Sequence, residues 1–265
     1  MREENEKMKI AVIDTETTSI EKPFVYDIGY LIFDTETQKV LLKRSYVVEQ
    51  TWHNRELFTT AYYADKREGY ISRMKGKTAI MEKLGYITQQ MARDFAYYGV
   101  EGAYAYNSPF DENVFNFNTE WYKIINPFDN VPWYDIRGYV HKFIAFNPAF
   151  QHFCEENERF TESGNYSTTA ETLFQYIAED TDFAEEHTAL ADAEIELEIL
   201  LYCIGKGAEW NTAYKVYRSV PRKVDRVCEV KTADGEVVQY PYNTATVYKE
   251  KNRKMRIVLK KREDK

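Results

Sequence analysis

Two carboxylates in the string Asp14-Thr15-Glu16 directly follow a short apolar run, and they are the first residues whose spacing suggests chemistry. If the run is a strand, residues two positions apart leave the same face about 7 Å apart, so both carboxylates can hold one metal ion. The same four residues, DTET, recur from Asp34 to Thr37. Identical chemistry cannot separate the two copies, so the elements around them must decide which copy is functional.

Two more segments place acidic residues near helix starts. Asp111, in "AYNSPFDENVF", lies at a predicted junction between a strand and a helix, where a carboxylate is often a plain helix cap. His187 precedes Asp192 by five positions at the opening of a long apolar helix. Positions five apart in one helix point about 140° apart, so we expect His187 in the preceding loop and Asp192 in the first turn.

Together these residues resemble the DEDDh-type 3′-to-5′ exonucleases, a family that includes the proofreading subunit of bacterial replicative polymerases and several RNA-trimming enzymes. The three ordered motifs of that family correspond to Asp14 through Glu16, Asn107 through Asp111, and His187 through Asp192. The similarity spans about residues 8–204. Two departures are Tyr106, where many relatives have a histidine, and Ser19, where a glycine often follows the paired threonines.

The resemblance implies a site at which two divalent cations, Mg²⁺ or Mn²⁺, support phosphodiester hydrolysis. The implied metal ligands are Asp14, Glu16, Asp111 and Asp192. His187 is the implied general base, because a histidine exchanges protons near neutral pH. The implied contacts of the terminal nucleotide are Thr15, Thr17 and Asn107. For the two threonines, a purely strand-forming role remains equally open.

The function that this resemblance implies is removal of 5′-mononucleotides from a free 3′ end, with single-stranded DNA favoured. A proofreading or repair role with a polymerase or other replication partner would suit such an enzyme. The alternatives are a 3′-to-5′ exoribonuclease of the same family, and a non-catalytic nucleic-acid-binding or scaffold module. Metal ligands do not read the sugar, so they do not distinguish DNA from RNA.

Several elements must position these residues. Segments rich in β-branched and aromatic residues predict a three-strand antiparallel meander at 8–13, 28–33 and 39–48. Strands alternating with helices then predict an α/β domain with a mixed sheet flanked by helices, which the resemblance specifies as RNase H-like. In such a meander Asp34 lies at the opposite sheet edge from Asp14, so the second DTET is predicted to be a hairpin turn.

Two helices are predicted from local patterns. Thr168 and Glu171 have the spacing of a capping box at the start of a helix that continues to about residue 178. An apolar stripe at helical spacing predicts another helix that ends near Gly99, and its members are Ile80, Leu84, Ile87, Met91 and Phe95.

The charge changes sign along the chain. The net charge is −8, but residues 221–265 carry +6 and the remainder −14. The predicted parts are an exonuclease domain at 1–207, a linker or short helix at 208–220, and a small basic β appendage at 221–265 with a turn at Asp234-Gly235. The appendage either binds nucleic acid through its tyrosines and basic residues or forms a solvated hairpin that docks a protein partner.

Composition excludes several other classes of protein. A chain of 265 residues with 44% hydrophobic content can bury a substantial core. The three cysteines Cys154, Cys203 and Cys228 are far apart, which argues against a disulfide framework and a structural zinc site. The N-terminus lacks the layout of a signal peptide and no apolar run approaches membrane-spanning length, so a cytoplasmic protein without membrane contact is expected.

Overall fold

The computed structural model describes residues 7–59, 61, 66–222, 226–231, 237–241 and 256–261. The chain divides into two compact units, Met1–Val220 and Pro221–Lys265. No helix in the described ranges is long and apolar enough to cross a membrane.

A six-stranded mixed sheet organises the first unit, with the strand order β4-β3-β2-β1-β5-β6. Its strands are β1 Lys9–Thr17, β2 Val25–Asp34, β3 Lys39–Val48, β4 Ile80–Glu82, β5 Val100–Ala105 and β6 Trp133–Asp135. The first three pair antiparallel, whereas β4, β5 and β6 join in parallel. The predicted meander and mixed sheet are therefore confirmed.

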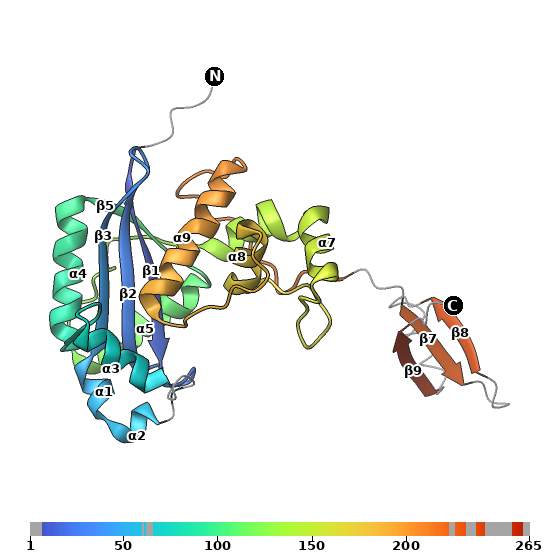
Figure 1. The fold of residues 1–265 in the computed structure, drawn as a ribbon, viewed down its shortest axis with the longest axis horizontal. Coiled ribbons are helices and arrows are strands. Elements are labelled where there is room, and N and C mark those ends of the chain that lie inside the picture. The colour runs from blue at the N-terminus through green and yellow to red at the C-terminus, as the bar shows by residue number, and fades with distance from the viewer. Residues whose placement is uncertain are drawn as a thin grey trace. The chain divides into compact units, whose positions relative to one another are not determined.

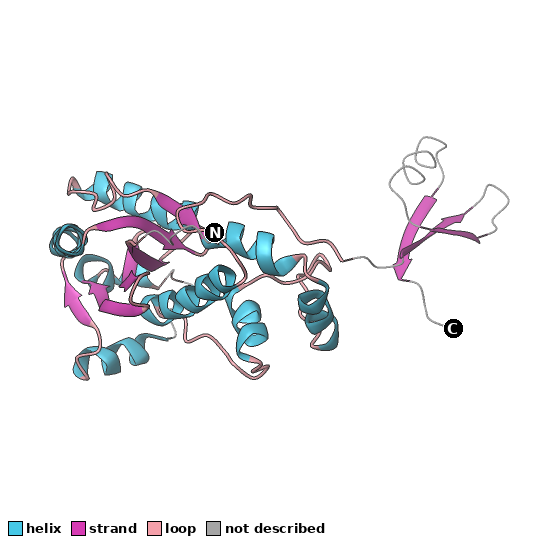
Figure 2. Ribbon diagram, turned by 90° about the horizontal axis from the view of Figure 1, so that it is seen from above, coloured by secondary structure: helices cyan, strands magenta, loops and turns pink. Residues whose placement is uncertain are grey.

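Helices cover both faces of this sheet (Figure 1). Strand β1 supplies Ala11 and Ile13 to the core under α4 Leu84–Tyr98 and α5 Ser108–Tyr122, and Ile10 and Val12 to the core on the other face. That second face is packed by α6 Ile136–Val140, the π-helical segment η2 His141–Ala145, α7 Pro148–Glu156, α8 Ala170–Ala178 and α9 Ala189–Gly205. Three short helices, α1 Glu49–His53, α2 Arg55–Phe58 and α3 Arg67–Lys75, form a smaller cluster around Trp52. Figure 2 shows the sheet between these layers from above.

The two DTET strings lie at opposite ends of the meander. The register pairs Lys9 with Asp34 and Asp14 with Gly29, so the first string lies at the far end of β1 from the second. Asp34 closes the β2–β3 turn by accepting hydrogen bonds from the backbone N–H groups of Glu36 (2.9 Å) and Thr37 (3.2 Å). The predicted hairpin turn is confirmed.

Two predicted helix starts were wrong. Ile80 does not begin the helix that ends at Gly99: it pairs with Tyr46 in strand β4 and is 49% exposed, and the helix starts at Leu84. Backbone pairing with the edge of β3 satisfies this segment, so its apolar residue need not face the core. Thr169, rather than Thr168, caps α8, because its side chain accepts the N–H of Thr172 at 3.2 Å.

Helix α9 approaches the sheet closely at Gly29. A Cβ atom added to Gly29 would lie 2.0 Å from the backbone nitrogen of Leu190, so only glycine permits this approach. Asp27, two residues earlier on the same face of β2, is fully buried and accepts the backbone N–H of Ala189 at 3.0 Å. Together they fix the first turn of α9 directly across from Asp14.

The segment 208–220, expected to be a linker or a short helix, is irregular and packs on the first unit. The N–H of Asn211 donates to the Tyr104 hydroxyl at 2.7 Å, and the Val220 carbonyl accepts the N–H of Tyr166 at 3.0 Å.

The second unit contains a three-stranded antiparallel sheet in the order β8-β7-β9, formed by Arg226–Lys231, Val237–Pro241 and Arg256–Lys261. The turn predicted at 234–235 lies outside the described residues.

The approach at Gly29 gives a stability test. Gly29→Ala should lower the free energy of unfolding by about 3 kcal/mol, because the new methyl group collides with backbone that cannot rotate away. Thermal or urea unfolding measures this loss. Gly205→Ala is the control within α9: its Cβ would meet nothing within 4 Å, so stability should stay equal or rise by up to about 1 kcal/mol. Equal stability of the two variants would contradict the close packing.

Candidate functional site: a buried carboxylate cluster

Strand β1 sends alternate side chains to opposite faces of the sheet. Ile10 and Val12 pack on the α9 side, so Asp14 and Glu16, which continue the same alternation, also face α9. Thr15 projects to the α5 side. The end of β1 therefore presents polar groups to both helices at once.

The first turn of α9 adds a third carboxylate. One oxygen from each of Asp14, Glu16 and Asp192 lies within 4.8 Å of the others. Asp192 is in the first turn of α9 and His187 is in the loop before it, as the spacing predicted. Three carboxylate oxygens this close together match the ligand chemistry of Mg²⁺ or Mn²⁺.

Asp111 reaches the same place from the other face. It lies in the first turn of α5, is 2% exposed, and accepts a hydrogen bond from the Thr15 hydroxyl at 2.7 Å. Its charge also raises the pKa of Asp14. All four carboxylates singled out from the sequence therefore gather around the end of β1, and Thr15 holds one of them in place.

His187 lies beside the cluster in a second acidic group. It adopts a left-handed backbone conformation (φ 50°), and its Nδ1 lies 3.6 Å from Glu185 Oε2. Ligand atoms of Glu171, Glu185 and His187 lie within 4.8 Å of one another. Burial, and then the Lys66 charge, lower the pKa of His187, so its imidazole is neutral at neutral pH.

The remaining two predicted contacts flank the cluster. The Thr17 hydroxyl donates to the carbonyl of Ser19 at 3.3 Å. Asn107 precedes α5 with φ 70°; its N–H donates to Asp135 Oδ1 at 3.0 Å, and its side-chain oxygen accepts from Arg137 at 2.6 Å. Asn107 therefore brings a guanidinium to the edge of the site.

The four carboxylates cannot all be ionised without compensation. Burial is the largest cause of each raised pKa, and charged neighbours add to it. The pKa of Asp14 lies well above its ordinary value, that of Glu16 is about 9, and those of Asp111 and Asp192 are about 7. Without cations, part of this cluster is protonated at neutral pH.

The donor set fits divalent cations. Asp192 Oδ1 is buried with no hydrogen-bond partner among the described residues, and Glu196 Oε2 is in the same state. A buried carboxylate oxygen without a donor is costly unless a cation satisfies it. The cluster therefore has the chemistry of a metal centre, held by Asp14, Glu16, Asp111 and Asp192.

Sequence reasoning missed two buried acids of this region, Asp27 and Glu196. Asp27 bonds the Tyr70 hydroxyl at 2.8 Å and lies 3.7 Å from the Arg73 guanidinium, besides capping α9. Glu196 follows Asp192 by four positions and is only 4% exposed. That spacing, an acid on the buried face of an apolar helix, was the available signal.

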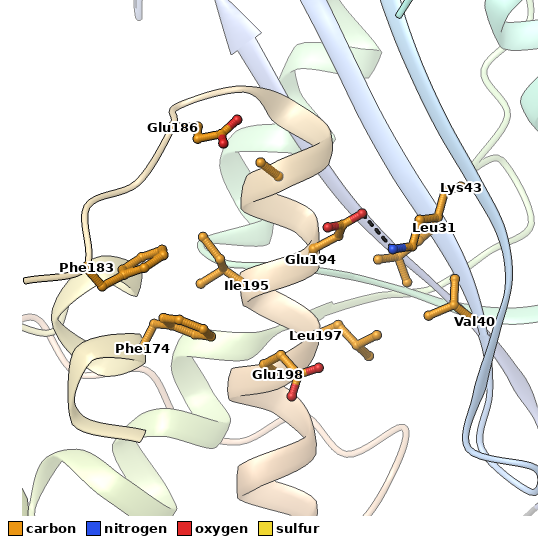
Figure 3. A pocket seen from close by; sticks show the side chains of 11 residues that line it. Leu31, Val40, Lys43, Phe174, Phe183, Glu186, Glu194, Ile195, Leu197 and Glu198 are labelled. Atoms are coloured by element: carbon orange, nitrogen blue, oxygen red, sulfur yellow. Dashed lines mark ion pairs between the residues drawn. The ribbon is translucent and has the colours of Figure 1, made fainter. Parts of the chain in front are cut away.

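The pocket in Figure 3 is separate from this cluster. It has a volume of about 360 Å³ and is lined by Ile195, Glu194 and Glu198 of α9, with Phe174 and Phe183 opposite. Glu194 forms an ion pair with Lys43 at 2.9 Å. Asp192 and Glu196 are not among its lining residues, so α9 separates the pocket from the carboxylates.

A second pocket, of about 330 Å³, borders the site at Tyr106 and Asn107. Its walls are rich in hydroxyl groups and include Arg137 and Arg218. The Tyr106 hydroxyl donates to the carbonyl of Thr168 in the same wall.

Comparison with known proteins identifies the fold. No family model matches the sequence, and no curated protein matches it. A structure described as 3′-end specific recognition of histone mRNA stem-loop by 3′-exonuclease superposes with a TM-score of 0.52 at 14% identity, over 90% of this chain and 72% of that one. A full-length 3′-exonuclease gives a TM-score of 0.52 at 13% identity, over 90% and 68% of the two chains. The chain has the RNase H-like fold of these 3′-exonucleases.

The raised carboxyl pKa values give a pH prediction. The folded, cation-free protein keeps protons that the unfolded chain releases above pH about 4, so its stability falls as pH rises toward about 9. Cations replace these protons, so the rise in Tm on adding Mg²⁺ should be larger at about pH 8.5 than at about pH 6. Differential scanning fluorimetry with Mg²⁺ or EDTA measures both. A rise that is the same at both pH values would contradict the cluster's electrostatics.

Proposed function

We propose that this protein is a metal-dependent 3′-to-5′ exonuclease that releases 5′-mononucleotides from nucleic acid, with single-stranded DNA ends as the favoured substrate. The observation that carries the proposal is the meeting of Asp14, Glu16 and Asp192 within 4.8 Å, with Asp111 beside them, at the end of β1. This meeting occurs in a fold shared with 3′-exonucleases, which supports the same reaction class.

The chain's own residues divide the work. Two bound Mg²⁺ or Mn²⁺ ions would supply the positive charge that activates a water molecule and stabilises the attacking and leaving oxygens. Asp14, at the centre of the cluster, would hold both ions, Glu16 and Asp192 would complete one site, and Asp111 would serve the other.

His187 would act as the general base. Its lowered pKa keeps the ring neutral, and the Glu185 carboxylate at 3.6 Å from Nδ1 stabilises the imidazolium that forms. We assign the proton-accepting role to Nε2. Thr17 and Asn107 would contact the terminal nucleotide, while Thr15 would contribute through its bond to Asp111.

RNA is the second candidate substrate. The structural neighbour that recognises the histone mRNA stem-loop favours an exoribonuclease, because it shares this fold over 90% of the present chain. A non-catalytic binding module is the alternative of another class, and the intact carboxylate cluster argues against it. A polymerase partner finds no support among the described residues, so the proposal extends only to the nucleic acid.

The experiment that tests the proposal uses 5′-labelled single-stranded DNA and RNA of the same sequence, with Mg²⁺ or with EDTA. A ladder shortened from the 3′ end, present only with Mg²⁺, is expected. The faster of the two substrates identifies the preferred sugar. Internal fragments, or release of the labelled 5′ nucleotide, would contradict the polarity; no cleavage of either strand would favour a binding module.

The repeated string provides a matched pair of variants. Asp14→Asn should abolish turnover, because it removes the carboxylate at the centre of the cluster. Asp34→Asn should leave turnover within about twofold, since Asp34 closes a hairpin at the other end of the meander. Both rates come from the same ladder assay, with circular dichroism to show that both variants fold. A comparable loss in both would mean that the strings are assigned wrongly.

Base and ligand can also be separated. His187→Ala should lower kcat by about 10²- to 10⁴-fold, the usual scale for loss of a general base, while Mn²⁺ affinity stays close to that of the wild type. Asp192→Ala should weaken Mn²⁺ binding as well, because Asp192 belongs to the three-carboxylate group. Single-turnover rates and calorimetry measure the two effects. Unchanged turnover in His187→Ala would remove it from the mechanism.

A further inference from the structure

Glu196 is a buried acid that the four-carboxylate site leaves unexplained. It is 4% exposed, in a stretch of α9 where Ile195, Leu197 and Ile199 are also buried. Its Oε2 has no hydrogen-bond partner among the described residues. Natural proteins rarely leave a buried carboxylate oxygen in this condition without a compensating group.

The position of Glu196 follows from the sheet register. Strands β1 and β5 are parallel with Val12 beside Tyr104, so Tyr106 comes level with Asp14. The backbone N–H of Tyr106 bonds the Glu196 carboxylate. Glu196 therefore lies near Asp14, on the side where β5 leads into α5 and Asp111.

The mutual electrostatic effects agree with this placement. After burial, the Glu196 charge is the largest cause of the raised pKa of Asp14, and the Asp111 charge is the largest cause for Glu196. Asp14 thus stands between two groups of carboxylates. Glu16 and Asp192 form one group, within 4.8 Å of Asp14, and Asp111 and Glu196 form the other.

We propose that Glu196 is a fifth metal-binding carboxylate, which together with Asp14 and Asp111 holds the second divalent cation, a role that rests on the proposed function. Asp111 already gives one oxygen to the Thr15 hydroxyl, so a second cation held by Asp14 and Asp111 alone would have few protein oxygens. Glu196 supplies the missing oxygen from the buried side of the site.

The rival explanation is a permanently protonated glutamic acid. A proton on Oε2 would remove the buried charge, but it would find no acceptor, because that atom has no hydrogen-bond partner among the described residues. A cation satisfies the oxygen and the charge together. The two explanations differ in their response to glutamine, which keeps the shape of a neutral acid and is a weaker ligand.

The test is Mn²⁺ binding to the full chain, measured by calorimetry and by electron paramagnetic resonance of the free ion. Wild type is expected to bind two Mn²⁺ ions. Glu196→Gln should weaken one of them by about tenfold or more and leave the other within about twofold. Glu198→Gln is the control, because Glu198 lies on the exposed face of the same helix; it should bind both ions as wild type does.

Each other outcome is decisive. Wild-type affinities in Glu196→Gln, or a single Mn²⁺ site in wild type, would overturn the role of Glu196 and leave the exonuclease proposal standing if the ladder appears. No Mn²⁺ binding and no hydrolysis in wild type would overturn both. If Glu196→Gln fails to fold by circular dichroism, Glu196→Asp replaces it: the shortened carboxylate should still weaken one site, and unchanged binding would overturn the inference.

Discussion

Repulsion among carboxylates buried around one strand end is the constraint on which the rest of the structure depends. Burial raises the pKa of Glu16 to about 9 and those of Asp111 and Asp192 to about 7, so the cation-free protein holds protons where it would otherwise hold charge. Such an arrangement costs folding free energy. A site of this kind is retained when a cation compensates the charge and uses it for chemistry, as in phosphodiester hydrolysis.

The fold holds this unfavourable cluster together with a few specific contacts. The alternation of β1 sends Asp14 toward α9 and Thr15 toward Asp111 on α5. Gly29 admits the backbone of α9 beside Asp14, and the buried Asp27 caps its first turn. These contacts lie at the edge of two large apolar cores, whose packing supplies the stability that the cluster consumes.

Much of this architecture was predictable from local patterns. Apolar runs and turn chemistry identified the meander, which in turn separated the functional DTET from the hairpin copy at Asp34. The stripe that began at Ile80 misled, because backbone pairing with β3 overrode its helical spacing. Glu196 escaped notice because its neighbours form an ordinary apolar helix, and only the three-dimensional contact with Tyr106 and Asp14 gives it meaning.

The most direct test of this account is the number of protons released when the folded protein binds Mn²⁺. Calorimetric titration at about pH 7 in two buffers of different ionisation enthalpy gives that number. Because Asp14 and Glu16 have pKa values raised well above neutrality or to about 9, the account predicts release of more than one proton per protein molecule. Mn²⁺ binding without proton release would show that the carboxylates are already ionised, and would contradict the electrostatic basis proposed for the site.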